Sequence, residues 1–303
     1  MDDDKLKVIN SVSYGFRKGF GVQKAVTVAR NIRRDHPWVL KSDIQSFFDK
    51  IQRETLKNDI SRRLGKSSVV PLVCCAIDTE IHCTNSSEKS RIEKAGIQPG
   101  LGLRQGMPLS PLLSNVVLRE FDATLHKRKV RMVRYADDFA IFADSEPECR
   151  SILPLVKNLL AAKQHNVPEP GPESKTVIYR PDSAVEFLGF ELRPSKQGKY
   201  VVAIPAAAFN ELKKRLDQFR DFNEARNKWR YFSQTVSTLN STVNGFVNVY
   251  EAGNNFGDFR AHAVNCRNQA LNDLLGSIFG VEVLSKLDKS RRDFLDLIGD
   301  SYD

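Results

Sequence analysis

The chain has 303 residues, of which 46 are Lys or Arg and 37 are Asp or Glu, so its formal net charge is +9 at pH 7. At roughly 100–200 residues per domain, this length predicts two globular units or one catalytic unit with several lobes. Apolar residues make up 41% and aromatic residues 9% of the chain, which excludes intrinsic disorder of the whole chain. The positive net charge leaves open whether the chain binds a polyanion such as a nucleic acid.

Targeting and cysteine signals point to the cytoplasm. No stretch approaches the roughly 20 apolar residues that a membrane-spanning helix needs. The chain starts MDDDKLKVIN, which is acidic where a signal peptide would be basic and then apolar. The 5 cysteines are an odd number without a repeated Cys-x-x-Cys spacing, which argues against disulfides and a structural zinc site. We therefore expect a cytoplasmic protein with reduced thiols.

The first predicted elements are a helix, a strand and a second helix. Apolar residues at helical spacing over residues 22–34, with basic residues between them, predict a helix that Pro37 ends. Residues 38–44 are typical of a short buried strand, and Asp43 lies at its end. A helical pattern resumes over residues 49–64.

The middle of the chain contains a loop and a hairpin. Residues 92–111 are rich in Gly and Pro, which predicts a loop, and a helix then begins. Two apolar runs, residues 130–135 and 139–143, predict a β-hairpin. Its tight turn carries two adjacent acids, Asp137 and Asp138.

The last third changes from strands to helices. Residues 177–179 and 185–192 predict a further pair of strands, and a domain boundary is expected near residue 200. The Lys and Arg residues of the helices beyond it fit contacts with a nucleic-acid backbone and fit a solvated helix face equally well. These amphipathic helices are predicted at residues 206–222, 228–250 and 262–275.

Three acids are expected to lie together at one edge of a sheet. Asp43 ends a strand and Asp137 and Asp138 occupy the hairpin turn, so their carboxylates would repel one another without a divalent cation. Mg²⁺ is the expected ion, because it binds oxygen ligands and keeps positions for water and substrate phosphates. Two such ions about 3.5–4 Å apart would activate a 3′-hydroxyl and stabilise a leaving pyrophosphate. Asp residues are also common in turns, and the pair alone favours that simpler explanation.

Five blocks in chain order reverse this weighting, because they resemble motifs of reverse transcriptases. Three of them resemble the family's palm motifs, a fourth its later palm motif, and a fifth the turn that grips the primer. The amino-acid sequences of these blocks, and that of residues 13–17, are similar to those of bacterial reverse transcriptases related to group II intron proteins. The resemblance covers about residues 11–200, and residues 244–250 faintly resemble the thumb of the same group. The five blocks are residues 41–49, 104–111, 134–139, 173–176 and 187–190.

The resemblance implies an α+β fold: a right-hand polymerase palm of ferredoxin-like βαββαβ type over residues 1–200 and a helical thumb over residues 201–303. Only 42 residues precede Asp43, so the family's N-terminal fingers are expected to be shortened or absent. A shortened sequence, a partner subunit that supplies the fingers, and relaxed use of the template would each explain this.

The resemblance also assigns roles to residues of the nucleotide site. Asp43 and Asp137 would bind the metals directly, Asp138 would assist, and the backbone of Ile44 would add a ligand. Of the residues that face the nucleotide, Phe48 matches the bulky side chain that excludes a ribose 2′-hydroxyl and so selects deoxynucleotides. Gln105 and Gly106 would line the floor under the incoming base, and Lys175 would approach the triphosphate. Contacts with primer and template fall to Tyr135, Ala136, Leu188, Gly189 and Arg17.

The implied activity is that of an RNA-directed DNA polymerase that adds dNTPs to a 3′-hydroxyl with two Mg²⁺ ions, for which Mn²⁺ would substitute. Its partners would be an RNA template and a DNA primer or product, with a structured non-coding RNA or a further subunit. Antiphage defence is the expected role. Two alternatives stay open: a template-independent or protein-primed DNA polymerase, and a non-catalytic nucleic-acid-binding subunit of a split enzyme.

Overall fold

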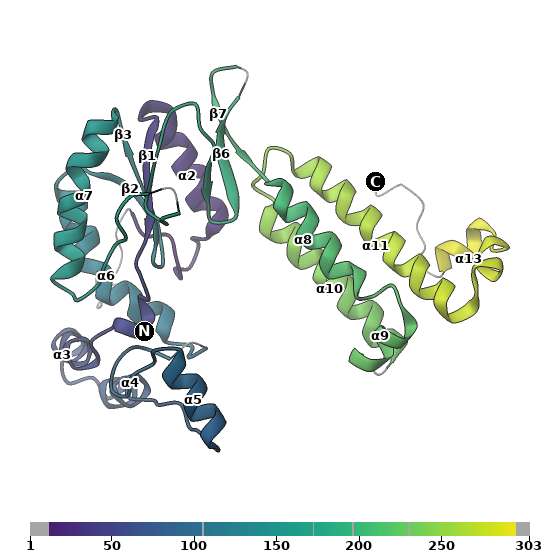
Figure 1. The fold of residues 1–303 in the computed structure, drawn as a ribbon, viewed down its shortest axis with the longest axis horizontal. Helices are drawn as coiled ribbons and strands as arrows, with labels where there is room; N and C mark the ends of the chain where they lie inside the picture. Colours follow the sequence, from purple (N-terminus) through teal and green to yellow (C-terminus); the bar gives the residue numbers. More distant parts are fainter. Residues whose placement is uncertain (1–11, 105, 172, 196, 230, 295–303) are drawn as a thin grey trace. The chain divides into compact units, whose positions relative to one another are not determined.

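A computed structural model describes residues 12–104, 106–171, 173–195, 197–229 and 231–294 (Figure 1). The described residues divide into two compact units. The first reaches Leu188 and includes Arg193–Tyr200, and the second includes Gly189–Leu192 and resumes at Val201. Gln105, one of the predicted nucleotide-site residues, lies outside the described residues.

The first unit is built on a four-stranded sheet. Its strands are β1 (Trp38–Asp43), β2 (Arg131–Tyr135), β3 (Asp138–Ala143) and β4 (Val177–Tyr179), in the order β2-β3-β1-β4. Every neighbouring pair is antiparallel. Each residue of β3 after its first is buried. Because successive strand residues point to opposite faces, both faces of β3 are covered.

Three long helices pack on this sheet. Helix α2 (Val22–Asp35) contacts β2 and β3, α6 (Ser110–Lys127) contacts β2, and α7 (Glu146–Ala161) contacts β1 and β3. The sequence pattern predicted α2 to within a residue. It did not predict α7, whose N-cap Ser145 accepts a hydrogen bond from the Glu148 N–H.

Three shorter helices lie between β1 and α6 in the chain, and Figure 1 shows them grouped at one end of the first unit. They are α3 (Arg53–Leu64), α4 (Val69–Ile77) and α5 (Ser86–Lys94). The helix predicted from residue 49 was wrong in its start, because a short 3₁₀ turn, η1 (Phe48–Lys50), comes first. The predicted loop begins later than residue 92, because α5 continues to Lys94.

The predicted pair of strands at residues 177–179 and 185–192 is wrong. Strand β4 pairs with β1, whereas β5 (Val185–Phe187) belongs to a second sheet with β6 (Phe190–Pro194) and β7 (Tyr200–Ala203). Leu188 and Gly189 have φ angles of 54° and 80°, so the chain turns between β5 and β6 where one long strand was expected.

The second unit is mainly helical, and α8, α10 and α11 contact one another. Leu212, Leu239 and Phe259 are completely buried among them. The predicted bounds were too long for α8, too early for α10 and too short for α11, and α9 was not predicted. The helices are α8 (Ala206–Asp217), α9 (Phe222–Lys228), α10 (Phe232–Tyr250), α11 (Phe256–Phe279), α12 (Val281–Ser285) and α13 (Lys289–Phe294).

Membrane and disulfide features agree with the composition. Among the described residues, no helix combines the length and apolar character needed to cross a bilayer. All five cysteines are free thiols in the described part of the chain.

His165 makes the stability of the first unit sensitive to acid. Burial and the nearby Lys50 lower the pKa of His165 to about 4, and its ring packs on Phe47 at a centroid distance of 4.9 Å. The fold therefore favours the neutral ring, whereas the unfolded chain protonates near pH 6.5. We expect the free energy of unfolding to be unaffected above that pH and to fall by about 3 kcal/mol as the pH drops to about 4.

Denaturant titrations between pH 4 and 7 measure this effect. His165→Leu should remove that part of the pH dependence, and substitution of the exposed His82 by Gln should retain it. Parallel curves for the wild type and His165→Leu would contradict the prediction.

Candidate active site

The pairing of β1 with β3 brings two of the predicted acids together. Asp43 lies directly opposite Asp138 in the antiparallel register. Ala136 and Asp137 form the two-residue connection between Tyr135 and Asp138, which are themselves paired. Asp138 is thus the first residue of β3 rather than part of the turn. All three carboxylates come from one end of the two strands.

Burial and mutual repulsion act on these acids. Desolvation, followed by the charge of Asp43, raises the pKa of Asp137. Desolvation also raises the pKa of Asp138 to about 6, with further contributions from Asp137 and Asp43 that the charge of Lys41 opposes. Like charges directly opposite each other destabilise a sheet. A cation beside the three acids would therefore stabilise the fold as well as serve chemistry.

Lys175 supplies a positive charge that is bonded directly to one of the acids. Its ammonium forms an ion pair with Asp43 Oδ2, and this contact raises the pKa of Lys175. The Lys175 side chain is 74% exposed and that of Asp43 18% exposed. A cavity of about 460 Å³ lies over the acids. Lys41, Asp43, Asp137, Asp138, Lys175 and Tyr179 are among the residues that line it.

Two oxygens of this cavity suit a divalent cation. Asp43 Oδ1 and Asp138 Oδ1 are buried and accept no hydrogen bond from the described residues. A buried charged oxygen without a partner is costly, and carboxylate oxygens are the ligands that Mg²⁺ binds. The donor set therefore fits the ion, although the described residues contain no preassembled group of three or more His, Cys, Asp or Glu side chains for a metal. The N–H of Ile44, the predicted backbone ligand, donates to the Asp137 carbonyl at 3.2 Å.

A buried ion pair that was not predicted fixes the hairpin turn. Arg134 and Asp122 of α6 are both fully buried and bonded to each other, with Arg134 Nε 2.7 Å from Asp122 Oδ1. Arg134 Nη1 also donates to the carbonyl of Ala136 at 2.7 Å and to Asn115 Oδ1 at 3.2 Å. Ala136 has a φ of 56°, which is unfavourable for an L-residue. The bond from Arg134 stabilises this conformation beside Asp137.

The segment of Arg17 lies beside the same turn. The backbones of Tyr14 and Arg134 are bonded at 2.8 Å, and a Cβ on Gly15 would lie 2.8 Å from the Ala136 nitrogen. Arg17 Nη1 donates to the Ser13 carbonyl at 2.6 Å, and its guanidinium lies 4.0 Å from the centroid of the Phe20 ring. Arg17, Tyr135 and Ala136, which were predicted together as primer and template contacts, therefore belong to one structural neighbourhood.

The other predicted residues lie in different places. Phe48 begins η1, and its carbonyl accepts a hydrogen bond from Leu103 at 2.8 Å. Gly106 is exposed and has a φ of 84°. Leu188 and Gly189 form the turn between β5 and β6. None of these four predicted residues is among the described residues that line the acid-lined cavity.

An antiparallel sheet with carboxylates concentrated at one strand end is the arrangement of a nucleotidyltransferase catalytic domain. The family model described as "Reverse transcriptase (RNA-dependent DNA polymerase)" matches residues 2–192, which is more than half of the chain. The chain belongs to the reverse transcriptase family.

Individual relatives match parts of the chain. It is 31% identical to Protein YkfC of Escherichia coli (strain K12) over 131 residues, which are 39% of this chain and 30% of YkfC. It is 28% identical to the putative COX1/OXI3 intron 1 protein of Saccharomyces cerevisiae over 116 residues, which are 38% of this chain and 13% of that protein. The chain thus spans less than a third of these curated relatives.

A solved structure extends the similarity of fold. Apo telomerase from Candida tropicalis aligns with 97% of this chain and 52% of its own, with a TM-score of 0.51 and 12% sequence identity. At this identity the alignment shows a shared fold.

Substitution of Asp122 tests the importance of the buried ion pair. Asp122→Asn leaves the guanidinium of Arg134 buried without a counter-charge, so we expect the free energy of unfolding to fall by about 3–5 kcal/mol. Glu146→Gln, which breaks an exposed pair with Arg150, should cost about 1 kcal/mol or less. Urea denaturation measures both values, and similar small losses for the two variants would contradict the prediction.

Removal of Lys175 tests whether its ammonium competes with a metal ion for Asp43. We expect Lys175→Gln to bind Mn²⁺ about two- to five-fold more tightly without nucleotide, because an exposed ion pair contributes about 1 kcal/mol at most. Calorimetric titration with MnCl₂ measures the affinity. Lys57→Gln provides the control, since Lys57 pairs with Glu54 and Asp78 instead. Equal affinities for all three proteins would show that Lys175 does not compete.

Proposed function

We propose that the chain is the catalytic part of an RNA-directed DNA polymerase that adds dNTPs to a 3′-hydroxyl. The observation that carries the proposal is the register of β1 and β3, which sets Asp43 opposite Asp138 with Asp137 in the adjoining turn. The buried, unpartnered oxygens of Asp43 and Asp138 support a divalent cation there.

In the proposed reaction, Asp43 and Asp137 bind the metal ions, Asp138 assists, and the Ile44 backbone adds a ligand. When bound, two Mg²⁺ ions, or Mn²⁺ in their place, activate the 3′-hydroxyl and stabilise the charge on the leaving pyrophosphate. Lys175 exchanges Asp43 for the triphosphate, because its ammonium is exposed and an exposed ion pair is weak. As a protonated amine it can also donate a proton to the departing pyrophosphate.

We assign the four-stranded sheet and its helices to a polymerase palm and the helices of the second unit to a thumb. The strand order β2-β3-β1-β4, with helices between β1 and β2 and between β3 and β4, is the ferredoxin-like βαββαβ arrangement and supports this assignment.

Substrate selection is assigned to Phe48, Gln105 and Gly106. Phe48 is proposed to exclude the ribose 2′-hydroxyl, and Gln105 and Gly106 to lie under the incoming base. Gly106 has a left-handed φ, which glycine adopts without strain and which lets the backbone approach a ligand closely.

Primer and template contacts are assigned to two turns. We propose that Arg17, Tyr135 and Ala136 contact the primer end or template, since they lie beside the acids. We propose that Leu188 and Gly189 contact the primer from the turn between β5 and β6. The surplus of nine positive charges favours association with both nucleic-acid strands.

Substitution of Asp137 and Asp138 tests the proposed function. Asp137→Asn and Asp138→Asn should each reduce dNTP incorporation on an RNA-templated DNA primer by at least about 10³-fold, because metal ligands supply several kcal/mol to the transition state. Primer extension with Mg²⁺ measures the rate, and circular dichroism confirms folding. Asp144→Asn is the matched control, since it removes an exposed acid just beyond the other end of β3.

A wild-type rate of dNTP incorporation by Asp137→Asn and Asp138→Asn would overturn the enzyme assignment. Equal incorporation with and without RNA would favour a template-independent polymerase.

We also propose a role in antiphage defence, which the same variants test. Hosts that carry Asp137→Asn or Asp138→Asn should be as sensitive to phage in plaque assays as hosts without the protein. Full protection by these variants would contradict that role.

A further inference from the structure

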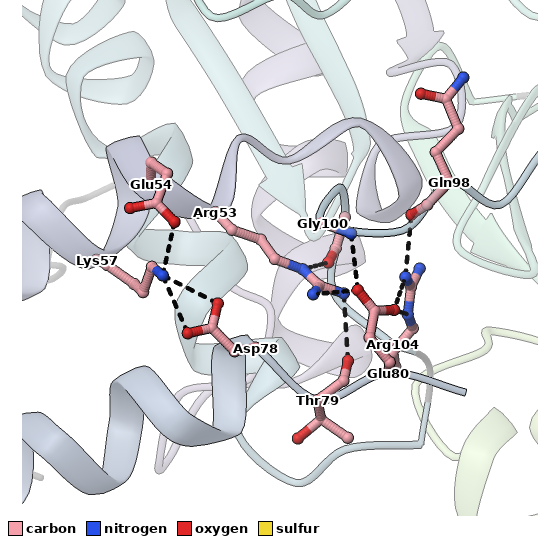
Figure 2. Close-up of polar contacts among 10 residues, drawn as sticks. Arg53, Glu54, Lys57, Asp78, Thr79, Glu80, Gln98, Gly100 and Arg104 are labelled. Carbon is pink, nitrogen blue, oxygen red and sulfur yellow. Dashed lines mark hydrogen bonds and ion pairs between the residues drawn. The ribbon is translucent and has the colours of Figure 1, made fainter. Parts of the chain in front are cut away.

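A cluster of charged groups surrounds Glu80, which lies between α4 and α5 (Figure 2). Its carboxylate accepts hydrogen bonds from Arg53 Nη1 and from the Gly100 N–H, both at 2.7 Å. Arg104 Nε donates to the second oxygen at 3.1 Å, and Arg104 Nη2 also contacts it. We call Arg53, Glu80, Gly100 and Arg104 the Glu80 cluster. It joins the start of α3 to two points of the loop that leads into α6.

The Glu80 carboxylate is charged throughout the ordinary pH range. Burial acts to raise the pKa of Glu80, but hydrogen bonds from Arg104, Gly100 and Arg53 lower it to about 2. The two arginines are 3% and 9% exposed, so their charges need this partner more than surface charges would. Among the described residues, Glu80 is the one carboxylate that both arginines contact.

The arginines of the cluster also bind the loop backbone. Arg53 Nε donates to the Gly102 carbonyl at 2.7 Å, and Arg104 Nη2 donates to the Gln98 carbonyl at 3.0 Å. Together with the bond from the Gly100 N–H to Glu80, these contacts fix three positions along residues 98–102.

The same loop is bonded to the segment that carries Phe48. The Leu103 N–H donates to the Phe48 carbonyl at 2.8 Å, and the Gly102 N–H donates to the Ile51 carbonyl at 2.9 Å. Gly102 has a φ of 76°, and a Cβ there would lie 2.6 Å from the Asp49 carbonyl oxygen. The two backbones are therefore in contact without spare room, and a displacement of the loop would displace η1.

We infer that Glu80 is a positioning residue for nucleotide selection. It fixes the loop of residues 98–104, and this loop fixes the backbone of Phe48 through Leu103. Arg104, which ends this loop, lies two positions before Gly106 in the chain. The inference rests on the proposed function, in which Phe48 excludes the ribose 2′-hydroxyl. Glu80 itself has no role in contacting the substrate.

Glu80→Gln is the variant that tests this inference. It retains the size of the side chain and one acceptor oxygen, but it removes the charge that the two arginines share. We expect KM for dNTPs to rise about five-fold or more and the preference for dNTPs over rNTPs, as the ratio of kcat/KM values, to fall by a similar factor. The value of kcat at saturating dNTP should stay within about two-fold of wild type.

Asp78→Asn provides the matched control. Asp78 lies two residues before Glu80, and its carboxylate binds Lys57 at 3.0 Å rather than the loop (Figure 2). This variant should have wild-type KM and wild-type discrimination. Glu80→Gln values equal to those of Asp78→Asn would overturn the inference, and so would a loss of kcat with unchanged discrimination, since that result indicates a merely structural role.

Hydrogen exchange separates this inference from the proposed function. The amides of Gly100, Gly102 and Leu103 should exchange faster in Glu80→Gln than in the wild type or Asp78→Asn, and this readout needs no activity. If the wild type incorporates no dNTP, the proposed function fails and, with it, the role in nucleotide selection, whereas faster exchange would still show that Glu80 fixes the loop. Unchanged exchange would overturn the inference directly. If Glu80→Gln does not fold, Arg104→Lys is compared with Lys57→Arg by the same measurements and with the same expected directions.

Discussion

The guanidinium of Arg134, which comes from strand β2, has no solvent exposure, and the equally buried carboxylate of Asp122 balances its charge. An unpaired charge at this depth would cost several kcal/mol, so β2 and α6 must be placed such that the two groups meet. The same guanidinium donates to the carbonyl of Ala136, whose backbone conformation is unfavourable by itself. The turn that carries Asp137 therefore depends on an ion pair between a strand and a helix.

The register of β1 and β3 follows from burial rather than from the acids. Both faces of β3 are covered, and a slip of one residue would move its whole buried set to the wrong faces. Asp43 and Asp138 are consequently placed opposite each other although their charges repel; burial above all, and then the charges of Asp137 and Asp43, raise the pKa of Asp138. Burial of the apolar strand residues offsets the destabilising repulsion between the acids. The same repulsion favours the binding of a cation beside them.

Elements with a clear apolar period could be predicted from the sequence almost to the residue, as α2, β1 and β3 were. Helix α7 was missed although the sequence carries signals for it: Ser145 and Glu148 have the spacing of a helix start, and its buried residues recur at helical spacing around Pro154. The second sheet was missed because residues 185–192 were taken as one apolar strand, although the resemblance at residues 187–190 implied the turn that Leu188 and Gly189 form with positive φ angles.

The candidate site divides in the same way. Adjacent acids after an apolar run and an acid at a strand end are local features, but on their own they favoured an ordinary turn; the five ordered blocks that resemble reverse transcriptase motifs were needed to single out Asp43, Asp137 and Asp138. The Arg134–Asp122 pair and the Glu80 cluster could not be predicted, since they join residues that lie 12 to 27 positions apart in the chain. In the sequence each of these side chains is indistinguishable from an ordinary solvated charge.

The three ionic arrangements differ in exposure, and the roles proposed for them follow from that difference. Arg134 and Asp122 are wholly buried, so their bond can be broken only by unfolding the hairpin. Glu80 has a side chain that is 42% exposed and pairs with two nearly buried arginines, so the loop can be loosened without loss of the core. Lys175 is 74% exposed, and its pair with Asp43 can exchange with ions and phosphates from solution. The roles thus follow increasing exposure. The buried pair of Arg134 and Asp122 fixes the turn of Asp137, and the half-exposed Glu80 holds the loop bonded to Phe48. The exposed pair of Lys175 and Asp43 is the one that the proposed reaction breaks in each cycle.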